Sequence, residues 1–302
     1  MPAERTAALD RGRLAGLRAG AERPASMLPG LMVEADRVAS MVSQGVHGRR
    51  RTGVGETFWQ YRPYQQGEPA TAIDWRQSAR SRHLFVREQE WEAAQSVYLW
   101  VDQSASMRFR SAAGLPFKRD RAVLLALAAA ALLVRGGEQV AFLEAGARPR
   151  GGRFALSRMA EDMLAAAASG AALPPPAPVP RHARLVLIGD GLGDPDALAA
   201  RLGALAERHV DGVLMQIVDP AEAELPFAGR VMFDGLEGEG SALIGNVGEV
   251  RERYRRLFRA HGEALRDMAR RRGWTFVRHR TDRSAESGLL ALYQSMAPRR
   301  GH

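Results

Sequence analysis

Hydrophobic residues from about residue 95 onwards follow two alternating patterns. Short runs of consecutive apolar residues, typical of parallel strands covered on both faces, alternate with longer segments of helical periodicity. The runs predict strands at 96–102, 139–146, 184–191, 212–220 and 274–280. The longer segments predict helices at about 117–135, 155–168, 194–209, 248–272 and 285–296. Asp194 is placed to cap the start of the third helix.

Regular alternation of strand and helix predicts right-handed crossovers and a doubly wound, mostly parallel sheet. The expected fold class is therefore α/β and Rossmann-like, with residues 92–298 as the main domain. Residues 221–247 interrupt the alternation, and "GRVMFDG" (229–235) predicts one strand of a small hairpin.

Two segments of different character precede this domain. Residues 1–44 form an extension that we expect to be helical or loose, and "LPGLMVEADRVASMV" (28–42) predicts an amphipathic helix within it. Residues 45–91 are rich in aromatics, glycines and prolines and have poor helical periodicity. They predict a small strand-rich unit that ends in a strand near 84–87.

Polar side chains directly follow two of the predicted strands. The stretch "VYLWVDQSASM" ends an apolar run on Asp102, Ser104 and Ser106, and "RLVLIGDG" ends on Asp190. Because ligands bind beyond the carboxyl ends of parallel strands, these four residues face one another if the two strands are neighbours. Carboxylates and hydroxyls are hard oxygen ligands, so the set predicts an exposed Mg²⁺ or Mn²⁺ site. The alternative is that Asp102 and the serines only bond backbone amides in a turn.

Composition excludes several kinds of chemistry. The chain has no cysteine, which excludes disulfides, thiolate metal sites and a cysteine nucleophile.

The sequence shows no apolar run long enough to span a membrane and no secretory signal, so a cytoplasmic protein is expected. Lys118 is the single lysine and lies in "LPFKRD", outside any phosphate-binding loop. The glycines of "GDGLGD" (189–194) do not fit a dinucleotide fingerprint, so no nucleotide cofactor is expected.

The net charge of +9 comes almost entirely from arginine and favours acidic partners. The arginines are dispersed, and few aromatic residues lie among them. This pattern favours a solvated arginine-rich surface over a nucleic-acid site, which is kept as an alternative.

Two known families resemble this sequence. The combination of "VDQSASM" with a later "LVLIGDG" is similar to the metal-ion-dependent adhesion site (MIDAS) of von Willebrand factor A domains. The preceding segment resembles the bacterial family called domain of unknown function 58, in which such a domain follows a strand-rich segment. The matching residues are Arg62 with Tyr64, Gly67 with Glu68, Ile73–Asp74–Trp75 and Ser78–Ala79–Arg80. The resemblance covers about residues 45–298 and implies a von Willebrand factor A-like domain at 92–298.

The chain departs from that pattern at one expected metal ligand. The family pattern has a threonine after two glycines, where this chain has Arg153 in "RGGRFALSRM". Ser157 could substitute, although its predicted place is inside a helix. Arg153 could instead pair with Asp102 or Asp190 and supply the positive charge itself.

Taken with the resemblance, these residues predict a protein-binding module that is not an enzyme. The resemblance implies that the bound cation keeps a position open for an acidic side chain of the partner. It also implies a MoxR-type AAA+ ATPase as the partner, with the pair acting in assembly or maturation of unidentified client proteins. The alternatives are a metal-dependent phosphoryl or ester hydrolase at Asp102 and Asp190, and an arginine-rich nucleic-acid binder.

Overall fold

The computed structural model describes residues 29–44, 58–65, 70–81, 83–89, 94–144 and 146–296. The chain divides into two compact units, one of which spans His47–Ala94 while the other contains the remaining residues. Each unit is described by itself. Gly67, Glu68 and the whole of 1–28 lie outside the described residues.

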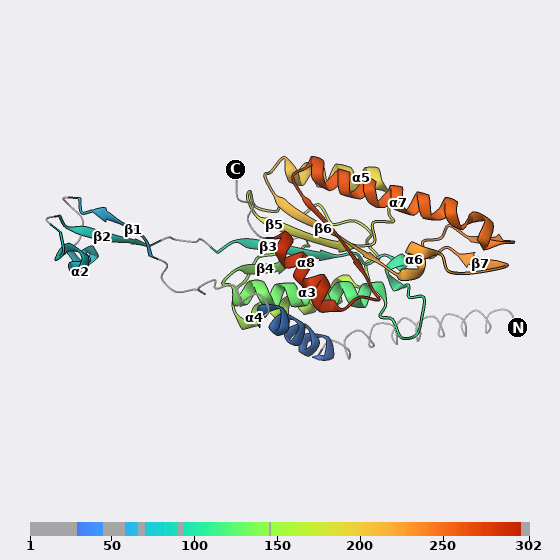
Figure 1. Ribbon diagram of the computed structural model, residues 1–302, viewed down its shortest axis with the longest axis horizontal. Coiled ribbons are helices and arrows are strands. Elements are labelled where there is room, and N and C mark those ends of the chain that lie inside the picture. Colours follow the sequence, from blue (N-terminus) through green and yellow to red (C-terminus); the bar gives the residue numbers. More distant parts are fainter. Residues whose placement is uncertain are drawn as a thin grey trace, which may run out of the picture. The chain divides into compact units, whose positions relative to one another are not determined.

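Five parallel strands form the central sheet of the larger unit, in the order β4-β3-β5-β6-β9 (Figure 1). Their bounds are Ser96–Val101 (β3), Gln139–Phe142 (β4), Arg184–Gly189 (β5), Asp211–Val218 (β6) and Thr275–Arg280 (β9). All four pairings are parallel. The predicted α/β class with a doubly wound parallel sheet is thus confirmed, and each predicted strand is present within a few residues of its expected bounds.

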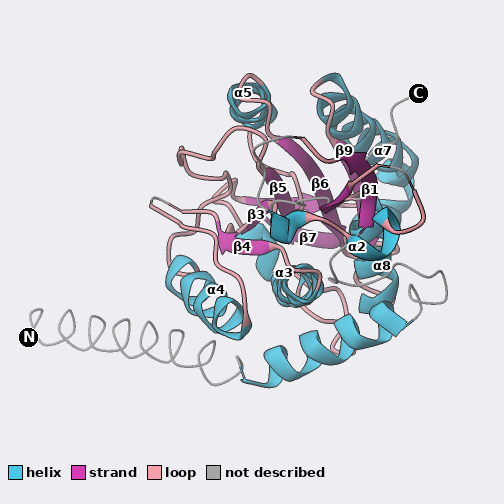
Figure 2. Ribbon diagram, turned by 90° about the vertical axis from the view of Figure 1, so that its left-hand side faces the viewer, coloured by secondary structure: helices cyan, strands magenta, loops and turns pink. Residues whose placement is uncertain are grey.

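Helices cover both faces of this sheet (Figure 2). Their bounds are Lys118–Arg135 (α3), Arg153–Ala166 (α4), Pro195–Ala206 (α5), Pro220–Glu224 (α6), Val247–Arg271 (α7) and Ala285–Ser295 (α8). Figures 1 and 2 both place α3, α4 and α8 on one face and α5 and α7 on the other. This two-sided cover explains why β3 and β5 are unbroken apolar runs, because side chains on both faces of these strands are buried.

Residues 29–44 form the amphipathic helix that the sequence predicts. Its apolar side, which includes Val38 and Ala39, is fully buried in the core of the larger unit. On its polar side Asp36 pairs with Arg135 at the end of α3, and Arg37 lies 3.2 Å from Glu286 at the start of α8. The helix therefore adds an outer layer over α3 and α8.

The interval between α6 and α7 holds the predicted hairpin. Strands β7 (Val231–Asp234) and β8 (Ser241–Ile244) pair antiparallel and are joined by residues 235–240. Gly238 and Gly240 in this connection have φ angles of 93° and 87°, which favour glycine over other residues. The connection turns back towards the central sheet, where it reaches the candidate site.

The smaller unit contains an antiparallel pair, β1 (Phe58–Pro63) and β2 (Phe85–Gln89), together with the short helix α2 (Trp75–Ser78). Asp74 caps α2 by accepting a hydrogen bond from the backbone N–H of Gln77 at 3.0 Å. The Ser78 hydroxyl accepts from the backbone N–H of Phe85 at 2.9 Å, which ties α2 to β2. Part of the motif that resembles the family therefore has a structural role within this unit.

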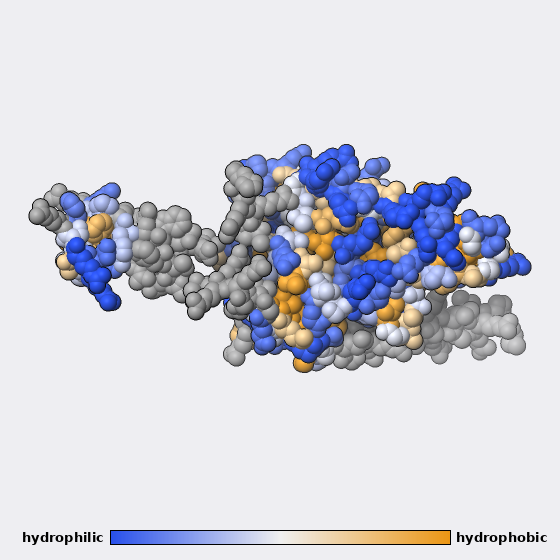
Figure 3. All heavy atoms as spheres, viewed as in Figure 1, coloured by the Kyte–Doolittle hydropathy of each residue, from blue (hydrophilic) through white to orange (hydrophobic). Residues whose placement is uncertain are grey.

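The described helices include none that is long and apolar enough to cross a membrane. Hydrophilic residues cover much of the face of the larger unit seen in Figure 3, including the outer side of α7. Arg253, Arg256 and Arg259 are exposed on this helix.

Candidate functional site

Asp102 and Asp190 follow neighbouring strands, as the prediction of a shared ligand-binding edge requires. Val101 of β3 pairs with Ile188 of β5, and the backbone N–H of Asp102 donates to the Ile188 carbonyl at 2.9 Å. The two carboxylates therefore lie at the same carboxyl edge of the sheet.

Hydrogen bonds join the four predicted site residues into one cluster. An Asp102 carboxylate oxygen (Oδ1) accepts from the backbone N–H of Ser104 at 2.8 Å. The hydroxyl oxygens of Ser104 and Ser106 lie 3.0 Å apart. The Ser106 hydroxyl donates to Oδ2 of Asp190 at 2.6 Å. Asp102 thus bonds a backbone amide in its own turn, as in the alternative of a purely structural turn. The same turn also brings all four side chains together.

Gly189 makes this close approach possible. A Cβ atom at this position would lie 2.8 Å from the Asp102 Cβ and 2.9 Å from its Oδ2. The absence of a side chain on the last residue of β5 therefore provides the space that the Asp102 side chain occupies.

The cluster is buried, which contradicts the expectation of an exposed site. Relative exposure is 3% for Asp102, 2% for Ser104, 9% for Ser106 and 2% for Asp190. Part of the cover comes from the β7–β8 connection, where a carboxylate oxygen of Glu237 accepts from the backbone N–H of Ser106 at 2.8 Å. The chain's own loop thus supplies a carboxylate to the Ser106 turn.

Lys118 contributes a positive charge that the sequence analysis did not assign to this site. It is the first residue of α3 and is fully buried. Its ammonium donates to Oδ2 of Asp190 at 2.9 Å and also to a carboxylate oxygen of Glu222. Asp190 Oδ2 therefore accepts from both Ser106 and Lys118.

Glu222 is held in place by a capping box at the start of α6. Its second carboxylate oxygen accepts from the backbone N–H of Asp219 at 2.9 Å, and Asp219 in turn accepts from the backbone N–H of Ala221 at 2.8 Å. The other Asp219 oxygen accepts from the backbone N–H of Ser111 at 2.9 Å. This arrangement fixes a second carboxylate, after that of Asp190, beside the ammonium of Lys118.

Burial and charge together shift the proton affinities in the cluster. Burial, with the neighbouring charge of Asp190, raises the pKa of Asp102 to about 7. Burial also raises the pKa of Glu222, although the Lys118 ammonium opposes the shift. For Lys118, burial acts to lower the pKa, but the charges of Asp190 and Glu222 outweigh it and the pKa is raised. Lys118 therefore stays charged at neutral pH.

The donor set does not fit the divalent ion that the resemblance implies. The ammonium of Lys118 and the hydroxyl of Ser106 already take up Oδ2 of Asp190, and Leu192 N–H donates to Oδ1 at 3.0 Å. A divalent ion bound through Oδ2 would have to displace one of these two donors, and an ion bound to either oxygen would be repelled by the ammonium of Lys118. Within the described residues, no group of three or more His, Cys, Asp or Glu is arranged to hold an ion.

The two positions discussed as replacements for the threonine ligand do not join the described cluster. Ser157 lies inside α4, as predicted. The Arg153 side chain lies outside the described part of the structure, although its backbone begins α4. The described cation beside Asp190 is Lys118.

Sequence reasoning missed Lys118, Glu222 and Glu237, although two of them left a signal. Lys118 is the single lysine in a chain with 43 Lys and Arg residues. The stretch "DPAE" places Asp219 at the carboxyl end of β6 and Glu222 three residues later, which is the capping-box spacing. The inward position of Glu237 depends on how the hairpin connection folds back, for which the sequence gives no local pattern.

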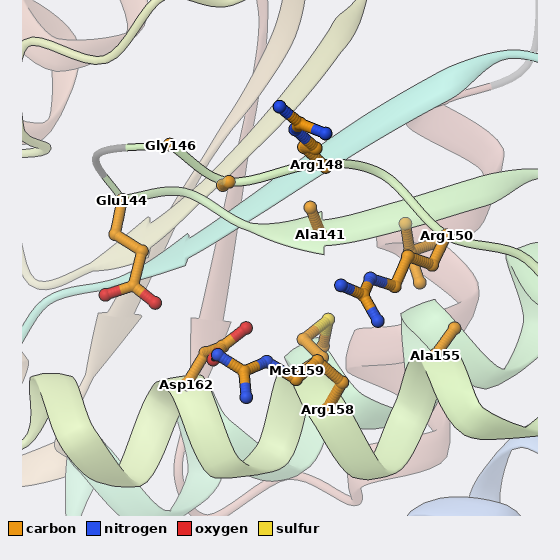
Figure 4. A pocket seen from close by; sticks show the side chains of 11 residues that line it. Ala141, Glu144, Gly146, Arg148, Arg150, Ala155, Arg158, Met159 and Asp162 are labelled. Carbon is orange, nitrogen blue, oxygen red and sulfur yellow. The ribbon is translucent and has the colours of Figure 1, made fainter.

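The larger described cavity, about 150 Å³, lies away from this cluster, between β4 and α4 (Figure 4). Charged side chains of both signs line it, and Arg158 pairs there with Asp162 at 2.8 Å. A second, smaller cavity lies between the helix at 29–44 and α3. Neither is lined by the predicted site residues.

These features define a Rossmann-like α/β protein with a closed, charged cluster at the carboxyl edge of its sheet. Residues 60–264 match the family model "Protein of unknown function DUF58", and the chain belongs to this family. The resemblance to domain of unknown function 58 that the sequence shows is therefore confirmed.

The curated relatives do not add a function. Uncharacterized proteins of Mycobacterium bovis and Mycobacterium tuberculosis are each 28% identical to this chain over 269 residues, which cover 84% of this chain and 84% of each relative.

Three solved structures match this chain with low TM-scores. An aerotolerance-related membrane protein from Bacteroides fragilis is 17% identical with a TM-score of 0.39, and the match covers 67% of this chain and 98% of that one. The conserved hypothetical protein BatB from Bacteroides thetaiotaomicron is 14% identical with a TM-score of 0.33 and coverages of 68% and 99%. An uncharacterized membrane spanning protein from Vibrio fischeri is 15% identical with a TM-score of 0.19 and coverages of 68% and 100%.

The predicted cytoplasmic location is contradicted by these neighbours and is corrected here. The proteins from Bacteroides fragilis and Vibrio fischeri are described as a membrane protein and a membrane spanning protein. The prediction relied on the lack of an apolar span and of a secretory signal, and such a lack does not decide where a protein resides. We assign no compartment to this chain.

Proposed function

We propose that this chain is a non-enzymatic protein-binding module. Its binding surface would be the carboxyl-edge surface, which we define as the loops at 108–114, 191–194 and 235–240. All three loops adjoin the Asp102 cluster, because Ser111 bonds Asp219, Leu192 bonds Asp190 and Glu237 bonds Ser106.

The observation that carries this proposal is that the reactive groups at this edge are buried and bonded to one another. The Ser106 hydroxyl already donates to Asp190, and Lys118 is held between two carboxylates. A small substrate would have to open the cluster to reach them. This favours binding over the hydrolase alternative.

The loops above the cluster have the composition of a protein-binding surface. Leu192 and Leu236 are both 48% exposed. The backbone N–H of Leu192 bonds Asp190, and Leu236 precedes Glu237, which bonds Ser106. Exposed charges, including Arg110 and Glu239, lie in the same loops. Apolar side chains surrounded by charges are typical of surfaces that bind proteins.

For the partner, we propose a MoxR-type AAA+ ATPase, with the pair acting on client proteins in assembly or maturation. This proposal is supported by the family to which the chain belongs and by the family resemblance described above. A separate ATPase would supply the nucleotide chemistry for which the sequence of this chain offers no phosphate-binding loop.

The test is a binding assay between the purified chain and the MoxR-type ATPase of the same genome. Leu192→Asp and Leu236→Asp should each weaken binding at least about tenfold, because a charge is forced into an apolar contact. Leu290→Asp is the matched control, since Leu290 is a partly exposed leucine on α8. Loss of binding in the control, or equal binding by all variants, would contradict the proposed surface.

A further inference from the structure

The Asp102 cluster holds more negative than positive charge. Asp102, Asp190 and Glu222 bring three carboxyl groups together, and Glu237 adds a fourth from the hairpin connection. Carboxylates in a buried site repel one another, so such a cluster requires a cation or loses its negative charge by protonation. The origin of that cation determines whether the protein depends on a metal.

The position of Lys118 is unfavourable unless its charge is needed. It is the first residue of α3, where the helix dipole favours negative rather than positive side chains. Its side chain is fully buried, which is rare for lysine unless it is paired. The carboxylates of Asp190 and Glu222 offset both costs.

The contacts of the ammonium are those of a coordinated cation. It donates to Asp190 at 2.9 Å and to Glu222, and it lies 5.9 Å from the centre of the Phe109 ring. Oδ2 of Asp190 is shared with the Ser106 hydroxyl, so one oxygen atom connects the ammonium to the serine turn.

The choice of lysine supports the same conclusion. Lys118 is the single lysine among 43 lysine and arginine residues, although either residue can serve on a solvated surface. A lysine ammonium is a compact point charge, whereas the planar guanidinium of arginine needs a wider, forked arrangement of acceptors. A compact cation fits between the two carboxylates that converge here.

We infer that Lys118 is the resident cation of the Asp102 cluster and that it makes the site independent of divalent metal. The cluster resembles a metal site in its oxygen donors, but the chain supplies the positive charge itself. This inference does not depend on the proposed binding function, because it concerns the cation of the cluster and not its partner.

The test is a calorimetric titration of MgCl₂ and MnCl₂ into the wild type, Lys118→Met and the double variant Lys118→Met/Asp102→Asn. Methionine keeps most of the length of lysine and removes the charge together with the N–H donors. The wild type should show no saturable binding. Lys118→Met should bind one divalent ion with a saturable heat, and the double variant should lose this binding.

Two results would overturn the inference. One is saturable metal binding by the wild type that disappears in Asp102→Asn. The other is a folded Lys118→Met protein that binds no metal, since the cluster would then not require a cation.

A variant that fails to fold still leaves the inference testable. If Lys118→Met does not fold, Lys118→Met/Asp190→Asn should recover folding, because it removes the carboxylate left without its cation. Failure of this double variant, with Asp190→Asn alone folded, would assign Lys118 a packing role and overturn the inference.

Discussion

Replacing Gly189 with alanine tests the close approach of β5 to Asp102. The new Cβ would lie 2.8 Å from the Asp102 Cβ, whereas carbon atoms pack best about 3.5–4.0 Å apart. The strands would therefore have to separate by about 1 Å at this point. They cannot do so freely, because the Asp102 N–H bonds the Ile188 carbonyl at 2.9 Å.

Overpacking of this kind costs about 1–3 kcal/mol of unfolding free energy. Because the nearest atom is the Asp102 Cβ, which is attached directly to the backbone and cannot rotate away, we expect Gly189→Ala to fall near the upper end, about 3 kcal/mol. For a unit of this size, that corresponds to a melting temperature lower by about 6–12 °C. The smaller unfolded-state gain from replacing glycine, about 0.4–1 kcal/mol, does not offset it.

The assay is thermal unfolding followed by circular dichroism, with Gly193→Ala as the matched control. A Cβ at Gly193 would lie 3.6 Å from the Ala172 Cβ, which is an ordinary contact. The control should melt within about 2 °C of the wild type. If Gly189→Ala melted with the control, the reasoning about the β3–β5 approach would be refuted.

Three further predictions concern other contacts of the larger unit. Lys118→Met should lower the unfolding free energy by about 3–5 kcal/mol in denaturant titrations, and Lys118→Met/Asp190→Asn should recover part of this loss. A loss below about 1 kcal/mol would contradict the buried charge pair. Burial and the neighbouring Arg121 lower the pKa of His279 to about 4. As pH falls from about 6.5 to 4, His279 therefore takes up a proton in the unfolded state but stays neutral in the folded state. The wild type should lose about 3 kcal/mol of unfolding free energy over that window. His279→Asn should lack this contribution, and equal acid sensitivity of both proteins would contradict it. Asp194→Ala should cost about 1 kcal/mol through loss of the α5 cap, and an unchanged unfolding midpoint would contradict that role.

The strands and helices of the larger unit could be predicted because their signals are local. The apolar run at 97–101 indicates a strand covered on both faces, and the longer apolar run at 122–134 indicates the buried helix α3 without knowledge of its neighbours. Asp102 and Asp190 could be predicted as neighbours because parallel strands bring their carboxyl ends to one edge.

The cation of the site could not be predicted from these local signals. Lys118 is the first residue of an apolar helix, and the sequence gives no indication that its side chain turns inward to Asp190 rather than outward to water. Glu222 lies in α6, directly after β6, and Glu237 lies in the hairpin connection. Only tertiary packing places them beside residues more than a hundred positions earlier. Burial of the cluster follows from these same long-range contacts.

The most direct test of the central claim uses the fact that the chain has a single lysine. Protein labelled only in lysine gives one side-chain ammonium signal in heteronuclear NMR, and that signal must come from Lys118. Buried and bonded to Asp190 and Glu222, the ammonium should exchange its protons slowly, give a resolved signal at neutral pH and keep its position when millimolar MgCl₂ is added. A signal with the shift and rapid exchange of free lysine, or one that moves in a saturable way with MgCl₂, would contradict the account.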